Sequence, residues 1–404
     1  AIIHQIDQPF ELGDRTPGYM MVFEGNAPDE RVNLSIVPVN QGYIMGNKRG
    51  SSSIHFFPKH MFGIHLHNED GSNRNDPLMG LPREHNWILY APYSDKTLMR
   101  NAVAYQLGRD LGRWSPRTKF FELFLHQGDG PVTTNHYHGV YVLTERIKWS
   151  EGRLEIEKLG PDDNQEPEVT GGYIIKKDRG NDLLRTSRGT ILNFVRPNDT
   201  DITPAQSQWI TDYLNRFESA LFGSNFTDPI IGYKPFIDVE SFIDYHHITE
   251  AFKEIDGFRL STFMYKHRNG RLTMGPLWDF NLSLGNADYH NGWKTDGWYY
   301  EEITRREYLD GWYIRLFQDP EFAKQYRRRW WQLRRGPFSY EHFEHRIEEN
   351  ASILDEAQKR NFERWPSLGT YVWPNPSGWD SRTTYRSEVD WMLQWIANRL
   401  EWMD

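Results

Sequence analysis

The stretch AFKEIDGFRLSTFMYKHRNGRLTMGPLWDF, residues 251–280, places two aspartates on either side of two strand-like segments. The segments FRLSTFMYK and RLTMGPLW are rich in β-branched and aromatic residues, and the HRNG between them is typical of a turn. Asp256 precedes the first segment and Asp279 follows the second. A hairpin at this point would therefore bring both acids to the same end.

Asp279 lies in an apolar run, between Trp278 and Phe280. A carboxylate in such surroundings is costly unless a cation or hydrogen-bond donors meet it. Two fixed acids suit Mg²⁺-assisted phosphoryl transfer, in which one holds metal and the other orients a hydroxyl nucleophile. They also suit glycoside hydrolysis by an acid and a base, and a structural role with an arginine or backbone amides. The spacing leaves all three readings open.

Composition narrows the classes of protein that this chain can be. Its 404 residues are enough for one large domain or two lobes. The net charge is -9 and the basic residues are spread along the chain, which argues against nucleic-acid binding. No apolar run reaches membrane-spanning length, and the absence of cysteine excludes disulfides and thiolate metal sites. The start AIIHQIDQPF, with no initiator Met and no targeting segment, favours a processed secreted or cell-surface protein, with a cytoplasmic location as the alternative.

The order of predicted elements indicates an α+β protein with a strand-rich N-terminal half (1–200) and a helical C-terminal half (201–404). Residue type predicts strands at 31–39, 118–126, 138–147 and 171–178. A helix capped by Ser94 or Asp95 interrupts them. Helical periodicity predicts further helices at 204–222, 238–253, 310–335, 339–361 and 386–403. The aromatic loops 285–300 and 364–381 resemble loops that border binding sites.

A second candidate region is RGSSSIHFFPKH, from Arg49 to His60. The glycine and three serines that follow Arg49 could line a phosphate-binding turn, with Lys59 adding positive charge, or could form an ordinary polar turn. In YVLTERI, Glu145 is an acid on an apolar strand and needs a cation, for which Lys59 is a candidate. Arg100, in DKTLMRNAVA, would either point towards the strands or simply cap its helix and face solvent.

Two histidine patterns could hold zinc, namely HLH at 65–67 and the helical pair His246 and Glu250. Neither has a third ligand nearby, so structural histidines are the favoured interpretation. The acidic loop 67–77 lacks the residue order of a calcium-binding hand and is interpreted as a solvated loop.

The motifs taken together resemble those of the CotH-type spore-coat kinases, an atypical branch of the protein-kinase-like fold. The resemblance covers residues 44 to 290 and rests on six motifs in the family's order: RGSSSIHFFPKH, WILYAPYSDKTLMRNAVAYQLGRDLG, HGVYVLTERIK, GGYIIKKDR, EIDGFRLSTFMYK and GPLWDFNLSLGN. It implies a two-lobed fold, with nucleotide-binding elements in 1–200 and the catalytic hairpin in 201–404. It also implies ATP, Mg²⁺ or Mn²⁺, and a protein substrate with Ser or Thr acceptors.

Roles follow from the resemblance at matching positions. Asp279 corresponds to the metal-binding aspartate, Asp256 to the catalytic aspartate and Lys59 to the lysine that contacts nucleotide phosphates. The nucleotide pocket would further involve Arg49, Ser51 and Ser52, with Glu145 and Arg100 in support.

The chain departs from the family at one position of the candidate site. Many relatives read W-D-F-D, but here Asn281 replaces the second acid. Asn can ligate Mg²⁺ through its carbonyl oxygen but adds no charge. Asp279 itself is retained and each part that phosphoryl transfer requires is present, so an active kinase is expected. The alternative is a non-catalytic surface or coat protein that recognises polysaccharide or a protein partner through its aromatic loops. A glycoside hydrolase is the third reading.

Overall fold

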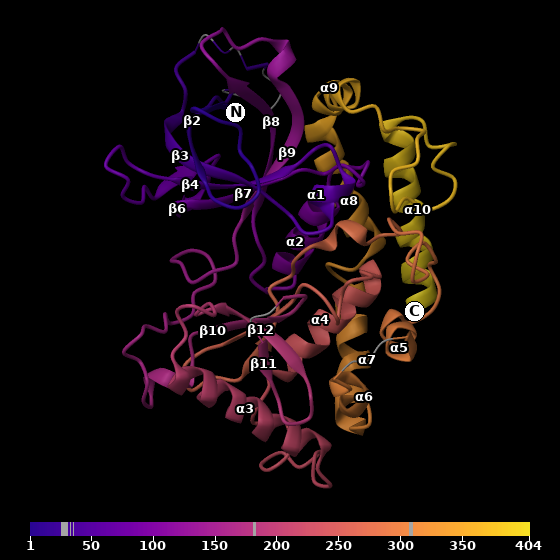
Figure 1. Ribbon diagram of the computed structural model, residues 1–404. Helices are drawn as coiled ribbons and strands as arrows, with labels where there is room; N and C mark the ends of the chain where they lie inside the picture. Colours follow the sequence, from indigo (N-terminus) through magenta and orange to yellow (C-terminus); the bar gives the residue numbers. More distant parts are fainter. Residues whose placement is uncertain (26–30, 33, 35, 181–182, 307–309) are drawn as a thin grey trace. The chain divides into compact units, whose positions relative to one another are not determined.

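A computed structural model describes residues 1–404 except 26–30, 33, 35, 181–182 and 307–309 (Figure 1). Contacts divide the chain into two compact units. Unit 1 comprises Ala1–Val103, Pro116–Arg146 and His345–Leu393, and unit 2 comprises Ala104–Ser115, Ile147–Glu344 and Gln394–Asp404. Three of the five boundaries between them fall inside helices, namely α2 (Arg100–Asp110), α8 (Tyr340–Leu354) and α10 (Tyr385–Met403). Each unit is described by itself.

Unit 1 is built on a closed β-barrel, whose strands are indigo to purple in Figure 1. Strand β1 pairs antiparallel with β2 and parallel with β8, so that Ile2 lies opposite both Met21 and Phe124 and the sheet closes on itself. The strands in barrel order are β1 (Ile2–Gln5), β2 (Thr16–Val22), β3 (Asn40–Arg49), β4 (Met61–Leu66), β7 (Asn86–Tyr90), β9 (Tyr137–Glu145) and β8 (Thr118–Gln127).

Alternate side chains of the barrel strands fill its interior, as the two-residue period of a strand requires. Along β4, Phe62, Ile64 and Leu66 are buried while the residues between them are partly exposed. Phe10, which precedes β2, also enters this core. A Cβ atom at position 46 would lie 2.3 Å from the Phe10 ring, so Gly46 is the residue that lets the ring in.

Short elements and one longer helix complete unit 1. They are α1 (Ser53–Phe56), the two-stranded sheet of β5 (Asp76–Leu78) and β6 (Leu81–Glu84), the 3-10 turn η1 (Thr134–His136) and α9 (Ala357–Arg364). Helix α9 packs against β9, and this packing places Asn361 of α9 beside Val140 of β9.

Unit 2 contains a five-stranded antiparallel sheet in the order β11-β12-β10-β13-β14. The strands are β10 (Tyr173–Lys177), β11 (Leu183–Arg185), β12 (Ile191–Arg196), β13 (Thr262–Lys266) and β14 (Leu272–Met274). The helices are α3 (Pro204–Phe222), α4 (Val239–Phe252), α5 (Tyr299–Arg306), α6 (Trp312–Leu316) and α7 (Pro320–Arg334), with 3-10 turns η2 (Glu168–Thr170) and η3 (Phe280–Leu282).

The structure confirms the α+β class and the hairpin of β13 and β14, in which Met264 lies opposite Met274 and Gly270 N–H donates to His267 O at 3.0 Å. Helices predicted at 204–222, 238–253 and 386–403 are α3, α4 and α10 to within one residue. The division into lobes at residue 200 stays a prediction. No helix in the described part of the chain is long and apolar enough to cross a membrane.

Three predicted elements are wrong. The described part of 31–39 contains no strand, and β3 begins at Asn40. The helix predicted at 310–335 is two helices, because Pro320 cannot continue α6 and Asp319 caps α7 by accepting from the Glu321 N–H at 2.9 Å. The helix predicted at 339–361 is likewise α8 followed by α9.

Candidate functional site

Asp279 has an unusual backbone that its aromatic neighbours hold in place. Its φ of 63° and ψ of 48° are left-handed, a conformation that few residues other than glycine adopt. The Asp279 N–H donates to the Tyr105 hydroxyl at 3.0 Å, and the Tyr105 ring stacks on Trp278 with centroids 6.0 Å apart. On the other side, Phe280 is buried and packs edge-on against Phe252. The apolar run around Asp279 therefore fixes the direction of its half-buried carboxylate.

Asn281 follows within the 3-10 turn η3 and is also half-buried. Its backbone oxygen accepts from the Asn286 side-chain amide at 2.9 Å. In the described residues the Asn281 side-chain amide has no hydrogen-bond partner, so its oxygen is available to a ligand.

Asp256 lies just after α4, in the segment that leads to β13. Its side chain is 23% exposed and its Oδ1 binds Arg259 Nη2 at 2.6 Å. Burial raises the pKa of Asp256 above the usual range, while the positive charges of Arg259 and Arg179 oppose that rise. A raised pKa makes this carboxylate a better proton acceptor than an ordinary surface aspartate.

A third acid, Glu254, belongs to the same region and was not predicted from the sequence. It is 2% exposed, and its Oε1 accepts the Asp256 backbone N–H at 3.1 Å. Its Oε2 is buried and has no hydrogen-bond partner among the described residues. Burial, followed by the carboxylates of Asp256 and Asp279, raises the pKa of Glu254 well above its usual value. Both predicted acids thus act electrostatically on one buried glutamate.

The oxygen donors of this region are of the kind that a hard divalent cation prefers, and they supply part of its coordination shell. Mg²⁺ is usually held by one or two carboxylates, and substrate phosphates and water complete its coordination. Asp279 and the Asn281 amide oxygen supply donors of that kind. Within the described ranges, no three His, Cys, Asp or Glu side chains are arranged to hold a metal by themselves. The protein thus offers part of a coordination shell.

The other predicted site residues belong to unit 1. Lys59 is 2% exposed, and its Nζ donates to Val140 O at 2.6 Å and to Asn361 Oδ1 at 2.8 Å. Burial lowers the pKa of Lys59 well below the usual lysine value. Asn361, carried by α9, also accepts the Val140 N–H at 3.0 Å and so fixes the lysine to β9.

The expected pairing of Lys59 with Glu145 is wrong. Glu145 instead binds Arg117, with Nη2 to Oε1 at 2.7 Å and Nε to Oε2 at 2.9 Å. The reason is the length of β9. Lys59 meets this strand at Val140, and five residues of strand separate Val140 from Glu145 by about 16 Å.

Arg49, Ser51 and Ser52 lie where β3 passes into the single helical turn α1. Gly50 has a φ of 131°, a conformation that favours glycine, and turns the chain between them. Ser51 is exposed, while Arg49 and Ser52 are half-buried. The three residues form the polar turn that the sequence predicts, and their part in binding nucleotide stays a prediction.

Arg100, at the start of α2, is buried and its guanidinium forms an ion pair with Asp95. Asp95 also accepts from the backbone N–H groups of Thr97 and Arg100, at 3.1 Å and 2.8 Å. The positive charge of Arg100 is therefore balanced within the protein. Arg100 positions the start of α2 rather than offering an open charge to a ligand.

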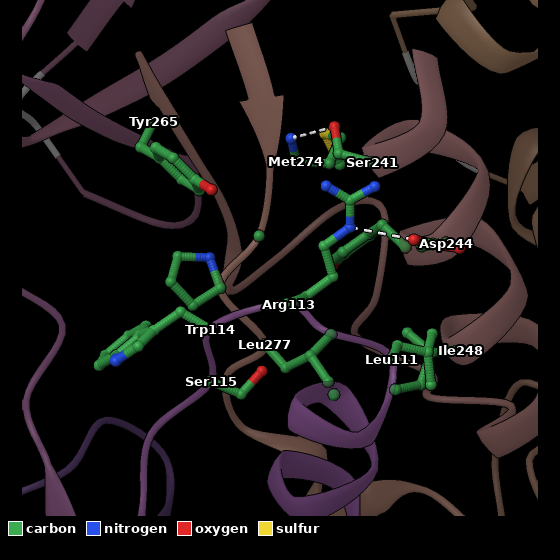
Figure 2. A pocket seen from close by; sticks show the side chains of 14 residues that line it. Leu111, Arg113, Trp114, Ser115, Ser241, Asp244, Ile248, Tyr265, Met274 and Leu277 are labelled. Carbon is green, nitrogen blue, oxygen red and sulfur yellow. Dashed lines mark hydrogen bonds and ion pairs between the residues drawn. The ribbon is translucent and has the colours of Figure 1, made fainter. Parts of the chain in front are cut away.

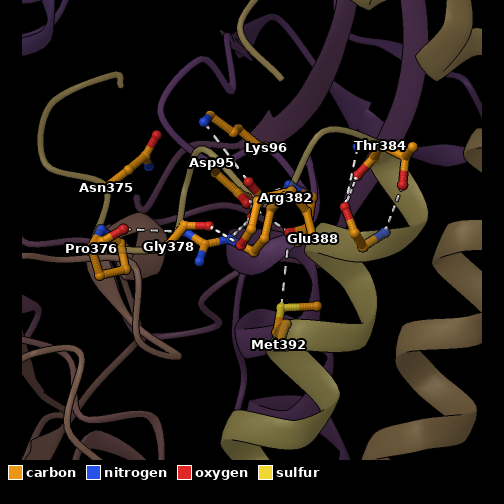
Figure 3. Close-up of polar contacts among 12 residues, drawn as sticks. Asp95, Lys96, Asn375, Pro376, Gly378, Arg382, Thr384, Glu388 and Met392 are labelled. Carbon is orange, nitrogen blue, oxygen red and sulfur yellow. Dashed lines mark hydrogen bonds and ion pairs between the residues drawn. The ribbon is translucent and has the colours of Figure 1, made fainter. Parts of the chain in front are cut away.

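Lys96, one residue after Asp95, belongs to a buried polar cluster of unit 1 (Figure 3). Its Nζ donates to Thr370 O at 2.7 Å and lies 3.8 Å from Glu388 Oε1. Arg382 binds the other oxygen of Glu388 at 3.0 Å. This cluster ties the DKT segment to the start of α10, which explains why the segment is charged and yet buried.

The helical histidine pattern at 246–250 is structural. His246 and His247 are buried among aromatic rings, and their pKa values are lowered mainly by burial. Glu250 does not face a metal. Its two oxygens accept from the backbone N–H groups of Tyr299 and Tyr300, and Arg399 Nη2 lies 3.0 Å from its Oε2.

A pocket within unit 2 contains none of the predicted site residues (Figure 2). It is lined by residues from the end of α2, from α4 and from the β14 region. Arg113, on its wall, binds Asp244 Oδ2 at 3.0 Å and Asp238 Oδ2 at 3.1 Å. Because this charge is already paired, the wall has no open cation to attract a phosphate group.

Comparison with known proteins identifies the family. Residues 47–403, all but the first 46 residues and the last one, match the family described as CotH kinase protein. A search of curated proteins finds no match. The family match extends well beyond the motifs quoted above, through the helices of the C-terminal half. The chain therefore belongs to the CotH kinase family.

Proposed function

We propose that this protein is an atypical, two-lobed protein kinase that transfers the γ-phosphoryl group of ATP to Ser or Thr hydroxyls of a protein. The observation that carries the proposal is the gathering of acids in unit 2. Asp256 and Asp279, 23 residues apart in the chain, both raise the pKa of the buried Glu254. Family membership supports the same reaction class.

In the proposed reaction Asp256 orients the acceptor hydroxyl. The hydroxyl oxygen forms a bond to the γ-phosphorus as the bond from that phosphorus to the bridging oxygen of ADP breaks. The hydroxyl proton passes to Asp256, whose raised pKa suits it to this role. Arg259, 2.6 Å from Asp256 Oδ1, holds the carboxylate in one orientation. Asp279 and Asn281 would hold a divalent cation, which when bound would supply positive charge to the phosphates of ATP.

Glu254 offsets the departure at Asn281. The amide of Asn281 brings no charge to the cation. The negative charge of Asp279 favours the protonated form of Glu254, so Glu254 would supply the missing charge when a bound cation displaces its proton. We propose that Lys59, Arg49, Ser51 and Ser52 of unit 1 serve the nucleotide, with Arg100 and Glu145 supporting the elements that carry them.

One observation favours the non-catalytic alternative, a surface or coat protein that recognises polysaccharide or a protein partner. Lys59 Nζ is buried against Val140 O and Asn361 Oδ1, and it reaches a nucleotide only if these contacts rearrange. A binding protein of this kind needs neither Asp256 nor Asp279. It would remain fully functional when both are replaced.

The test compares wild type with Asp256→Asn and Asp279→Asn. Transfer of γ-labelled phosphate is measured on casein and on the protein itself, with Mg²⁺ or Mn²⁺, and Tm is measured with and without ATP. A folded protein that binds ATP gains stability as RT ln(1 + [L]/Kd). We expect transfer to Ser or Thr in wild type and a large loss of transfer in both variants. We also expect an ATP-dependent rise in Tm that Asp256→Asn keeps and Asp279→Asn loses.

Equal phosphate transfer by wild type and both variants would contradict the proposal. So would the absence of any ATP effect on Tm at millimolar concentration. Release of sugar without ATP would instead establish the glycoside hydrolase reading.

A further inference from the structure

Helix α7 carries a row of positive charge on one exposed face. Lys324, Arg327, Arg328, Trp331 and Arg335 are exposed, and Trp331 is 48% exposed. They lie at positions i, i+3, i+4, i+7 and i+11, which share one side of a helix. Arg335 directly follows the last helical residue. These five residues are called the α7 basic stripe.

The opposite face of α7 packs into unit 2, and the other arginines of the same sequence run form ion pairs on that face or at its border. Arg329 binds Asp244 Oδ1 at 2.7 Å, and Arg334 binds Asp404 Oδ1 at 2.8 Å. Phe322 and Leu333 are buried on that face. The charges that stabilise the fold are therefore distinct from those of the stripe.

The arginines of the stripe form no ion pair within the described part of the chain. This holds for Arg327, Arg328 and Arg335. Lys324 has a single acidic neighbour, Glu321, with 3.8 Å between Nζ and Oε2 and with both side chains largely exposed. Such a surface contact contributes little stability. Three guanidinium groups are therefore left with their hydrogen-bond donors directed to solvent.

We propose that the α7 basic stripe is a docking surface for an extended acidic segment of a partner protein. Guanidinium groups bind carboxylates through paired hydrogen bonds, and the exposed Trp331 ring between Arg328 and Arg335 offers an apolar anchor. The stripe spans about 16 Å, the length of roughly five residues of extended chain. This surface does not depend on the proposed kinase reaction.

The net charge of the chain favours a short acidic segment over a long polyanion. At -9, the protein repels nucleic acid or an anionic membrane at long range. Charges separated by more than about 8 Å are largely screened at physiological salt, so a peptide that touches only the stripe escapes most of that repulsion. A single row of charge also matches one strand of peptide better than a broad surface.

The test measures binding of a fluorescein-labelled hexaglutamate peptide by fluorescence anisotropy at low and at high salt. The full chain is compared with a variant of the stripe, Arg327→Gln/Arg328→Gln/Arg335→Gln. The matched control is Arg185→Gln/Arg216→Gln/Arg271→Gln, which removes the same charge from other exposed positions of unit 2. A Trp331→Ala variant tests the anchor, and Tm values check that every variant is folded.

We expect the stripe variant to weaken peptide binding at least tenfold, the control to weaken it by less than about threefold, and Trp331→Ala to fall between them. High salt should weaken wild-type binding most. Equal loss in the stripe and control variants would overturn the proposal, because net charge alone would explain binding. Absence of peptide binding by wild type at millimolar concentration would also overturn it. Tighter, stripe-dependent binding of a DNA oligonucleotide or of phosphatidylserine vesicles would show that the occupant is not an acidic peptide.

Discussion

Glu254 Oε1 accepts the backbone N–H of Asp256 at 3.1 Å, while Glu254 Oε2 is buried without a hydrogen-bond partner among the described residues. One oxygen thus fixes the backbone of the proposed catalytic aspartate, and the other is left for a proton or a cation. Burying such a group costs stability unless it is neutralised. A substitution that removes the charge of Glu254 should therefore raise the stability of the protein and lower its activity.

Replacing Glu254 by Gln should stabilise the protein increasingly as pH rises above about 4.5. The pKa of Glu254 is raised in the folded protein, so the folded state holds this proton more tightly than the unfolded chain does. The stabilising effect of the wild-type glutamate is complete at low pH and is lost as pH rises towards the folded pKa. Gln does not titrate, so the difference in unfolding free energy between the variant and wild type should grow with pH. Urea unfolding between pH 4.5 and 8 measures it.

Glu218→Gln is the control for Glu254→Gln. Glu218 is equally buried, and its Oε2 likewise has no hydrogen-bond partner among the described residues, but its Oε1 accepts from two side chains, Thr190 and Trp312. A matching pH-dependent gain in this variant would show that the effect is general to buried glutamates. Phosphate transfer by Glu254→Gln should fall at the same time, and unchanged transfer would exclude a role for Glu254 in the site.

Asp279→Asn should reduce phosphate transfer by roughly 100-fold or more while the protein stays folded. Asn tolerates the left-handed backbone of position 279 and keeps the N–H that binds Tyr105, so the substitution removes little except charge. Asp279→Ala removes the carboxylate and also places alanine at a positive φ, which costs about 1–2 kcal/mol. Unfolding curves of both variants separate the two effects. Equal stability of the variants would contradict the strain argument.

Arg399→Met should destabilise unit 2 by about 3–5 kcal/mol, because it leaves the buried Glu250 carboxylate without its cation. Arg399 and Glu250 are both fully buried, with Nη2 and Oε2 3.0 Å apart. Arg386→Met on the same helix is the control. Arg386 is exposed and pairs with Glu348 and Asp390, so its loss should cost less than about 1 kcal/mol. The loss of unfolding free energy, measured by urea unfolding, should therefore be several times larger for Arg399→Met than for Arg386→Met.

Asn361→Ala should destabilise unit 1 by about 2 kcal/mol. The Asn361 oxygen accepts from both Lys59 Nζ and the Val140 N–H, so alanine leaves the buried Val140 N–H unpaired and removes one of the acceptors of Lys59 Nζ. Asn361→Asp keeps both contacts and supplies Lys59 with a carboxylate.

The two variants of Asn361 should also differ in their response to pH. In wild type the pKa of Lys59 is lowered in the folded protein. The contribution of this residue to the free energy of unfolding is therefore lost as pH falls below the usual pKa of lysine. The aspartate raises that pKa again, and Asn361→Asp should lose less stability than wild type between pH 9 and 6. A loss equal to that of wild type would show that the new carboxylate does not reach the Lys59 ammonium group.

The hairpin of β13 and β14 was predictable because its signals are local. A turn at HRNG and two short β-rich segments predict a hairpin that brings the acids on either side of it to the same end. Strands β13 and β14 form that hairpin. Helix α3 was predictable for the same reason, since Thr203 caps it and Pro204 suits its first turn.

The interactions that were missed depend on tertiary distance. Glu254 is visible in the sequence as one more acid, but only the fold shows that its Oε2 is buried and unpaired. Lys59 and Glu145 carry complementary charges, yet their positions along β9 keep them apart, and Asn361 lies 302 residues beyond Lys59. No local pattern indicates a partner so distant in the chain. The strand predicted at 31–39 is wrong for a different reason. A local signal is present there, but its β-branched residues do not become part of the barrel.

The closure of the barrel by β1 makes a short segment decisive for solubility. Strands β2 and β8 are both capped along their edges by Ile2–Gln5, so the barrel has no open edge. Proteolytic loss of this one strand would expose two edges at once, the four residues Gly18–Met21 of β2 and the four residues Phe124–Gln127 of β8. Open strand edges can pair with other chains. Cleavage between β1 and β2 should therefore increase aggregation of the protein, even though unit 2 is untouched.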